Sequence, residues 1–215
     1  QGRSISQIHS AEYRNPQQLA PGGVLVVGGG SSGVQIADEL LHAGRKVYLS
    51  VGPHDRPPRS YRGIDYCWWL GVLGEWDKPT PAQGREHVTI AVSGVRGGET
   101  VDFRRLALRG IELVGTTRSF DDGVATFEPD LATNVARGDE NYLAVLDAAD
   151  AYVARNGLQL PEEPQARVMP PDPPCLTDPK RTLDLAKAGV TSIIWATGYT
   201  SDFGWLPAGA LDERG

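Results

Sequence analysis

Three glycines in the stretch VLVVGGGSSGVQIADEL have the spacing G-x-G-x-x-G, by which a backbone can hold the pyrophosphate of a dinucleotide. We expect Gly28 to allow a tight turn, Gly30 to let phosphates approach the backbone, and Gly33 to let a helix pack closely on the preceding strand. Ser31 or Ser32 can cap that helix, whose first N–H groups would face the phosphates. The alternative is a glycine-rich turn in an ordinary α/β domain.

The residue that ends the next expected strand indicates which dinucleotide would bind. A site for NAD or FAD usually has Asp or Glu there, about 20 residues after the glycines, to bind the ribose hydroxyls. Ser50 stands at that place, and three arginines at positions 56, 59 and 62 follow it. A carboxylate would repel a 2′-phosphate, so we predict NADPH as the cofactor, with Ser50, Arg56 and Arg59 as ligands. Alternatively, the arginines belong to a solvated loop.

These residues need a strand–turn–helix–strand unit to position them. Apolar residues 24–27 predict a buried strand, the spacing after Ser31 predicts a helix that ends at Gly44, and residues 46–51 predict a second strand. Together they form the first βαβ unit of a parallel sheet. The remaining pattern predicts strands at 88–92, 111–115, 124–127 and 190–196, helices at 103–109 and 131–155 with a break or bend at Gly138, and helical turns at 182–187.

Composition excludes several classes of function. The formal net charge is −6 and no long basic run occurs, which argues against nucleic acid or an anionic membrane as a partner. No apolar run approaches the roughly 20 residues of a membrane span. Cys67 and Cys175 lie far apart and the histidines lack ligand spacing, so we expect no metal site and a reducing, cytoplasmic setting. The expected partner is a small-molecule substrate, and the oligomeric state stays open.

Several stretches together resemble the NADPH-binding half of flavin-containing monooxygenase-like flavoproteins. They are QIHSAEYRNP, VLVVGGGSSGVQIADEL, LSVGPHDRPPR, WWLGVLGEWD and IIWATGYTSDFGWL. The resemblance implies an α/β fold: a Rossmann-like three-layer NADP-binding domain of a protein with two dinucleotide-binding domains. By resemblance, Ala196, Thr197 and Gly198 lie beside a cofactor where the chain returns to an FAD domain. His9 matches a histidine before the NADPH strand, and we expect it to hydrogen-bond the connecting segment.

The resemblance also implies how the chain is divided. Residues 1–20 would be a connector from an FAD domain, 21–198 the NADP-binding domain, and 199–215 the start of the return. FAD would bind mostly through parts absent from this chain, so we expect a fragment that is truncated at both ends. The flavin-side catalytic residues would lie in those parts, and none is assigned here.

The expected function is the NADPH-binding portion of an FAD-dependent oxidoreductase. In a monooxygenase-like enzyme, NADPH would give hydride to the flavin, and the reduced flavin would then activate dioxygen. Two alternatives stay open: a flavoprotein reductase that does not oxygenate, and a non-catalytic NADP-binding module. A one-domain short-chain dehydrogenase is disfavoured because it needs Tyr-x-x-x-Lys, and no tyrosine here has a lysine four residues later.

Overall fold

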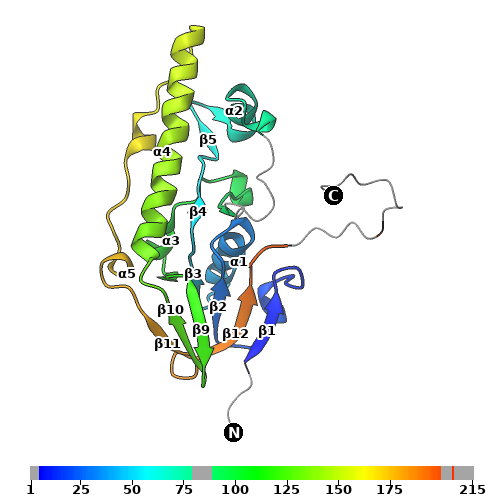
Figure 1. Cartoon of the computed structure of the whole chain (residues 1–215). Coiled ribbons are helices and arrows are strands. Elements are labelled where there is room, and N and C mark those ends of the chain that lie inside the picture. The colour runs from blue at the N-terminus through cyan, green and yellow to red at the C-terminus, as the bar shows by residue number, and fades with distance from the viewer. Residues whose placement is uncertain (1–4, 79–88, 200–204, 206–215) are drawn as a thin grey trace.

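A five-stranded parallel sheet forms the centre of the protein in the computed structural model, which describes residues 5–78, 89–199 and 205 (Figure 1). All neighbouring strands in this sheet run parallel. In spatial order they are β1 (Ser6–His9), β12 (Val190–Trp195), β2 (Gly23–Val27), β3 (Val47–Ser50) and β8 (Glu112–Val114). Every residue of β2 and β3 is buried, as expected for strands covered on both faces.

Helices cover one face of the parallel sheet and a second sheet covers the other. Val24 and Val26 of β2 pack with α1 (Ser31–His42) and α3 (Phe103–Leu108). Leu25 and Val27 point to the opposite face, because side chains alternate along a strand. There they meet an antiparallel sheet of β9 (Thr117–Asp121), β10 (Val124–Phe127) and β11 (Thr182–Asp184). The result is a three-layer α/β architecture, compatible with a Rossmann-like fold, in which a β-sheet supplies the third layer.

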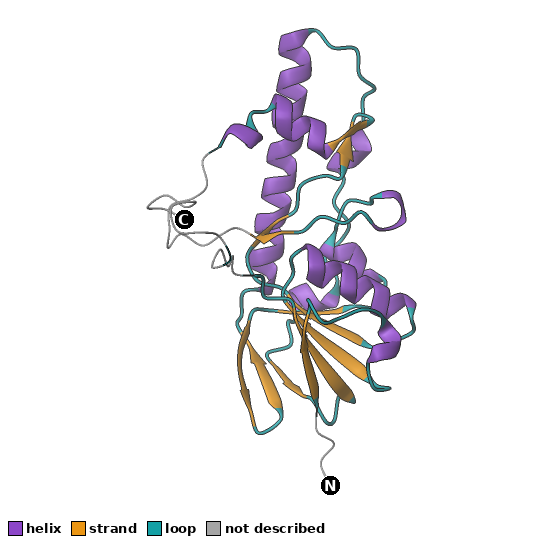
Figure 2. Cartoon of the chain, turned by 90° about the vertical axis from the view of Figure 1, so that its right-hand side faces the viewer, coloured by secondary structure: helices purple, strands orange, loops and turns teal. Residues whose placement is uncertain are grey.

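A second lobe stands above this sheet domain and is built around α4 (Leu131–Asn156) (Figures 1 and 2). Its other elements are α2 (Tyr66–Val72), the hairpin of β5 (Ser60–Tyr61) and β6 (Ile64–Asp65), and the segment with η4 (Pro164–Arg167). The core of this helical lobe includes Trp69, which has no exposed surface and donates its indole N–H to the carbonyl of Tyr61 at 3.1 Å. The first turns of α4 pack on the sheet domain through Leu131 and Val135, so one helix belongs to both parts.

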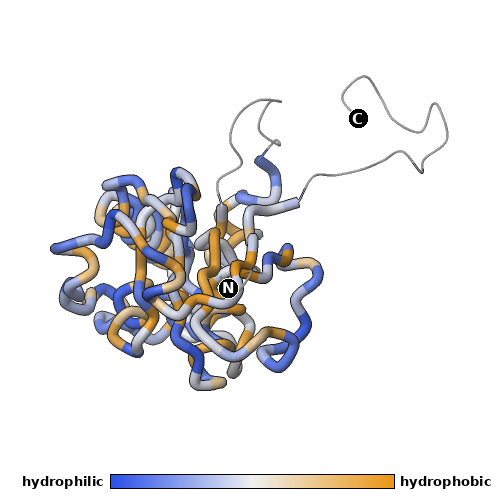
Figure 3. Tube along the Cα trace, turned by 90° about the horizontal axis from the view of Figure 1, so that it is seen from below, coloured by the Kyte–Doolittle hydropathy of each residue, from blue (hydrophilic) through white to orange (hydrophobic). Residues whose placement is uncertain are grey.

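The hydropathy of the chain follows this arrangement. Figure 3 shows hydrophobic segments through the middle of the molecule and hydrophilic ones at its outer turns. No helix in the described portion is both long and apolar enough to cross a membrane. The remaining elements are short: η1 (Pro16–Gln18), β4 (His54–Asp55), η2 (Glu75–Asp77), β7 (Thr89–Ile90), η3 (Val95–Gly97) and α5 (Pro174–Thr177).

The structure corrects the prediction of helical turns at residues 182–187. Residues Thr182–Asp184 form β11, which pairs antiparallel with β10. Leu183 is buried in the layer between the two sheets. This burial favours a strand, although the local sequence pattern favours a helix. Strands β1 and β9 were not predicted. Of the strand expected at 88–92 only Thr89–Ile90 is a strand, and residue 88 lies outside the described residues.

The structure shows no break at Gly138, because α4 is continuous through that position. A Cβ atom added to Gly138 would lie 2.5 Å from Nε2 of His54 and 3.3 Å from Cγ of Arg56. The glycine therefore lets β4 and the residue after it pack directly on the helix. The domain boundaries at 20 and 198 stay a prediction, and most of residues 199–215 lie outside the described residues.

Candidate functional site

The glycine turn follows β2 directly. Gly28 has a φ of +118°, and a Cβ there would lie 2.3 Å from the carbonyl oxygen of Ala196. A Cβ on Gly33 would lie 1.8 Å from the carbonyl oxygen of Gly28. Both positions therefore require glycine, the first for its dihedral angle and both for the close approach of backbones. The first turn of α1 is held against the end of β2.

This turn lies where the connections of the sheet change direction. From β2 the chain passes through α1 to β3 on one side, whereas β12 pairs with β2 on the other side. The amide of Ala196 donates to the carbonyl of Val27 at 2.8 Å, so the carboxyl ends of the two strands meet there. In open parallel sheets, ligands bind outside the carboxyl ends of the strands at such a point. Gly28 and Ala196 line it, and Thr197 and Gly198 follow as exposed residues.

The N-terminus of α1 has no side-chain cap. Its N-cap is Gly30, and no acidic residue lies in the first turn. This corrects the expectation that Ser31 or Ser32 caps the helix. The hydroxyl of Ser31 instead donates to the carbonyl of Ile90 at 2.8 Å and accepts from the amide of Val92 at 3.1 Å. Ser32 is exposed. The N–H groups of this first turn and the helix dipole leave a partial positive charge beside the glycine turn.

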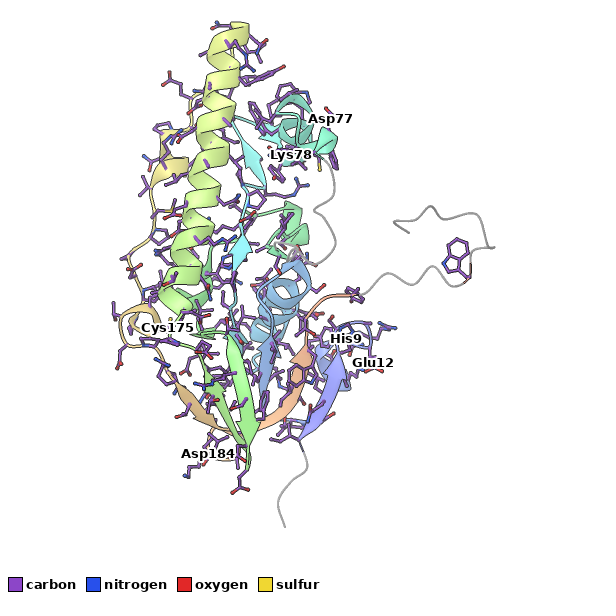
Figure 4. All side chains as sticks on the ribbon, viewed as in Figure 1. His9, Glu12, Asp77, Lys78, Cys175 and Asp184 are labelled. Carbon is purple, nitrogen blue, oxygen red and sulfur yellow. The ribbon has the colours of Figure 1, made fainter. Side chains whose placement is uncertain are left out.

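His9 joins the ends of β1 and β12, as predicted for a structural histidine (Figure 4). Its Nδ1 accepts from the amide of Ala11 at 3.2 Å, so the proton lies on Nε2, which donates to the carbonyl of Gly198 at 3.1 Å. The imidazole also meets the ring of Tyr199 edge to face, with centroids 5.2 Å apart. These contacts fix the segment that includes Thr197 next to the glycine turn.

Ser50 ends β3 at the predicted position, but its hydroxyl has only internal partners. The side chain is 2% exposed. Its Oγ donates to the carbonyl of Gly115 at 2.9 Å and accepts from the amide and the hydroxyl of Thr117 at 3.0 and 2.8 Å. The hydroxyl therefore ties the end of β3 to the connection between β8 and β9. As placed in this structure, it does not face an open ribose site.

Arg56 and Arg59 are held by carboxylates. Arg56 is 2% exposed, and its Nε and Nη2 both donate to Oδ1 of Asp139, at 2.9 and 2.5 Å. Its guanidinium also lies 4.5 Å from the ring centroid of Tyr142. The Arg59 side chain is 27% exposed and pairs with Asp65. The sequence shows these charges but not the distant carboxylate that buries Arg56, so it could not distinguish a ligand from an ion pair.

One aromatic side chain that the sequence did not single out, Phe103, lies against the glycine turn. A Cβ on Gly29 would lie 3.2 Å from Val51 and 3.5 Å from the ring of Phe103. The Phe103 ring contacts the imidazole of His54, with centroids 4.3 Å apart. The Nδ1 of His54 lies 2.9 Å from the carbonyl of Gly52, and burial lowers the pKa of this histidine. No periodic pattern marks this contact, because it joins segments nearly 50 residues apart.

Two cavities adjoin these elements. One of about 580 Å³ runs along α1 and includes Ser10, Ser32 and Gln35 in its wall, so it opens beside the first turn of the helix. Another of about 610 Å³ lies between the sheet domain and the helical lobe, with Arg56, Arg105 and Tyr142 in its wall. Within the described residues, no group of three or more His, Cys, Asp or Glu side chains is arranged to hold a metal ion.

Comparisons with known proteins were made across the whole chain. No family model matches it. A protein of Geobacillus kaustophilus named "uncharacterized oxidoreductase CzcO-like" is 26% identical over 213 residues, which are 98% of this chain and 44% of that protein. The "uncharacterized oxidoreductase CzcO" of Bacillus subtilis is 65% identical over 72 residues, 33% of this chain and 21% of that protein. The flavin-containing monooxygenase iboF of Amanita muscaria is 46% identical over 46 residues, 21% of this chain and 9% of that protein. The chain thus matches less than half the length of each of these relatives.

Proposed function

We propose that this chain, a relative of flavin-containing monooxygenase-like oxidoreductases, is the NADPH-binding portion of an FAD-dependent enzyme of that kind. One observation carries the proposal: the glycine turn lies where the carboxyl ends of β2 and β12 meet, with an uncapped helix N-terminus beside it. Strand, turn and helix follow one another in the order that dinucleotide binding requires.

The pyrophosphate would bind at the first turn of α1. The N–H groups of this turn can donate to an anion, and no carboxylate in the turn opposes a negative charge. Gly28 and Gly33 would bring turn and helix close enough to share the phosphates. The cavity beside Ser32 gives room for the rest of the cofactor. The helix N-terminus therefore supplies donors for a pyrophosphate, and the cavity adjoins them at Ser32.

The preference for NADPH would rest on what is absent from the end of β3. Ser50 replaces the carboxylate that would repel a 2′-phosphate, and its own buried hydroxyl adds no charge. Arg56 is enclosed with Asp139, so Arg59, whose side chain is 27% exposed, is the better candidate to meet the phosphate. Binding there would compete with its ion pair to Asp65, which is half exposed and weakly stabilising.

Ala196, Thr197 and Gly198 would carry the backbone past the nicotinamide end of the cofactor. Their small side chains and the bond from His9 to Gly198 would hold this segment close to the glycine turn. FAD, when bound in the whole enzyme, accepts hydride from NADPH and, once reduced, activates dioxygen. The residues of this chain would bind and orient NADPH and exclude water from it. No catalytic side chain is assigned.

A charge placed in the first turn of α1 tests the proposal. Ser32→Asp puts a carboxylate where the pyrophosphate would bind, and also stabilises the helix because an acid there complements the dipole. We expect NADPH to bind at least tenfold more tightly than NADH by titration calorimetry. We also expect Ser32→Asp to weaken NADPH binding by about tenfold or more at an unchanged or higher melting temperature. Ser32→Asn, of equal size and no charge, should bind normally.

The outcomes separate the parts of the proposal. Equal affinities for NADPH and NADH would contradict the 2′-phosphate argument and leave the glycine turn as a dinucleotide site. Normal NADPH binding by Ser32→Asp would show that the pyrophosphate does not bind at the first turn of α1. In the whole protein, a preparation without flavin that still binds NADPH would favour a non-catalytic NADP-binding module.

A further inference from the structure

A short segment lies against Gly30 and the start of α1, where the pyrophosphate is proposed to bind. We call residues 89–92 the strap. The hydroxyl of Ser31 bonds to it twice, to the carbonyl of Ile90 at 2.8 Å and the amide of Val92 at 3.1 Å. The side-chain amide of Gln35 donates to the carbonyl of Val92 at 3.2 Å. The strap is thus attached to the first two turns of α1.

The strap occupies the space beside Gly30. A Cβ added to that glycine would lie only 2.6 Å from Cγ2 of Thr89, and Gly30 is buried. A phosphate group is larger than a methyl group and needs to come within about 3 Å of the backbone amides. The methyl group of Thr89 and a phosphate seated on Gly30 cannot share this position. The Ser31 hydroxyl, a further polar group at the turn, is also taken by the strap.

We propose that the strap is an autoinhibitory cover of the dinucleotide site, which must leave Gly30 before the pyrophosphate can bind. This inference rests on the proposed function. The structure then represents the covered state, and NADPH binds the uncovered one. Because only the uncovered fraction of molecules is competent, the apparent affinity falls in proportion to that fraction.

The strap is held weakly enough to move. Its strand β7 pairs with β4 over two residues only, His54 with Thr89 and Asp55 with Ile90. One further backbone bond runs from the amide of Ala91 to the carbonyl of Asp55 at 2.8 Å, beside the three side-chain bonds to α1. Ala91 is fully buried, but the larger side chain of Ile90 is 46% exposed. Segments with few buried apolar contacts open at a low free-energy cost. A bound dinucleotide could therefore displace the strap without unfolding the rest of the protein.

Two substitutions at Thr89 test the cover without touching the glycine turn. Thr89→Ala removes the methyl group that faces Gly30, whereas Thr89→Val keeps a methyl group and the strand preference. We expect Thr89→Ala to bind NADPH about three- to tenfold more tightly by calorimetry, because the uncovered state becomes more populated. Thr89→Val should bind as the unchanged protein does. Equal or weaker binding by Thr89→Ala would overturn the proposal.

Amide hydrogen exchange of the unchanged protein gives a second readout. The amides of Ala91 and Val92 are bonded in the covered state, to Asp55 and Ser31 respectively. We expect both to exchange faster with saturating NADPH present, while amides at the start of α1 exchange more slowly. If NADPH binds and the strap amides keep their protection from exchange, the strap does not cover the site. The proposal that the glycine turn binds NADPH would remain. If NADPH does not bind even to Thr89→Ala, the proposed function itself fails.

Discussion

Arg56 and Arg59 have similar local sequence but different surroundings in the structure. Arg56 shares Oδ1 of Asp139 through two nitrogens, and Arg104 pairs with the other oxygen of the same carboxylate. Arg59 pairs with Asp65 at the surface of the helical lobe. A buried ion pair loses much stability when one partner is removed, whereas an exposed pair loses little. Arg56 therefore has a structural role, and the proposed contact with the 2′-phosphate falls to Arg59.

Methionine at either position removes the charge and keeps most of the side-chain volume. We expect Arg56→Met to lower the free energy of unfolding by about 3 kcal/mol and to leave the ratio of NADPH to NADH affinity unchanged. Arg59→Met should cost less than about 1 kcal/mol but lower that ratio roughly tenfold, through loss of a charge-assisted bond to the 2′-phosphate. Urea unfolding and calorimetry measure the two effects. The reverse pattern of affinities would assign the 2′-phosphate to Arg56.

His54 makes stability depend on pH. Burial between Phe103 and α4 lowers its pKa, and Arg56 lowers it further, although the bond to Gly52 and the carboxylates of Asp55 and Asp139 oppose this shift. As the pH falls, this histidine is therefore protonated near pH 6.5 in the unfolded chain, but only at a lower pH in the folded protein. Stability from this group is complete above pH 6.5 and declines as the pH falls below it.

The comparison of pH 7.5 with pH 5.5 covers the range in which His54 affects stability, while most carboxylates stay ionised. We expect the free energy of unfolding in urea to be lower at pH 5.5. His54→Asn keeps a donor for the Gly52 carbonyl but does not titrate, so the difference between the two pH values should become smaller. An unchanged pH difference in the variant would show that another group causes it.

At the scale of whole elements, the sequence predicts those helices and strands whose conformation follows from the local hydrophobic pattern. It does not predict those that depend on contacts with distant segments. Continuous apolar runs and helical spacing predicted β2, β3, β8, β10, β12, α1, α3 and α4. The segment that forms β11 was predicted to be helical, because its preference is weak and pairing with β10 decides its conformation. The glycine spacing located the candidate turn. The burial of Arg56 and of the Ser50 hydroxyl depends on residues 83 and 65 positions away, which no local pattern reveals.

Gly138 tests how α4 and β4 pack. In an exposed helix interior, replacement of glycine by alanine raises stability by about 1 kcal/mol. Here the added Cβ would lie 2.5 Å from Nε2 of His54 and 3.0 Å from its Cδ2, so the ring and β4 must shift. We expect Gly138→Ala to lower the free energy of unfolding by about 1–3 kcal/mol in urea. A gain in stability would show that Gly138 has no packing role and that β4 lies farther from the helix.

At the scale of the molecule, α4 joins the sheet domain to the helical lobe, and the strap lies against α1 and β4. Residues Leu131 and Val135 of α4 pack on the sheet domain, whereas Tyr142 and Leu146 belong to the core of the lobe. The strap pairs with β4, which lies against the same helix at Gly138. The strap therefore contacts both β4, which packs on α4, and the first two turns of α1.

The relatives are more than twice as long as the part matched here, so the reaction itself has to be tested on the whole protein. We expect that protein to purify with flavin and NADPH to bleach the visible absorbance of the oxidised flavin in anaerobic stopped-flow experiments. Ser32→Asp should slow this reduction at limiting NADPH by about tenfold or more without lowering flavin content, because under the proposal the carboxylate would repel the phosphates of NADPH and not those of FAD. Ser32→Asn should reduce at the normal rate. If Ser32→Asp changed flavin content instead, the first turn of α1 would hold the phosphates of FAD rather than those of NADPH, and the order of the two dinucleotide domains would have to be reversed.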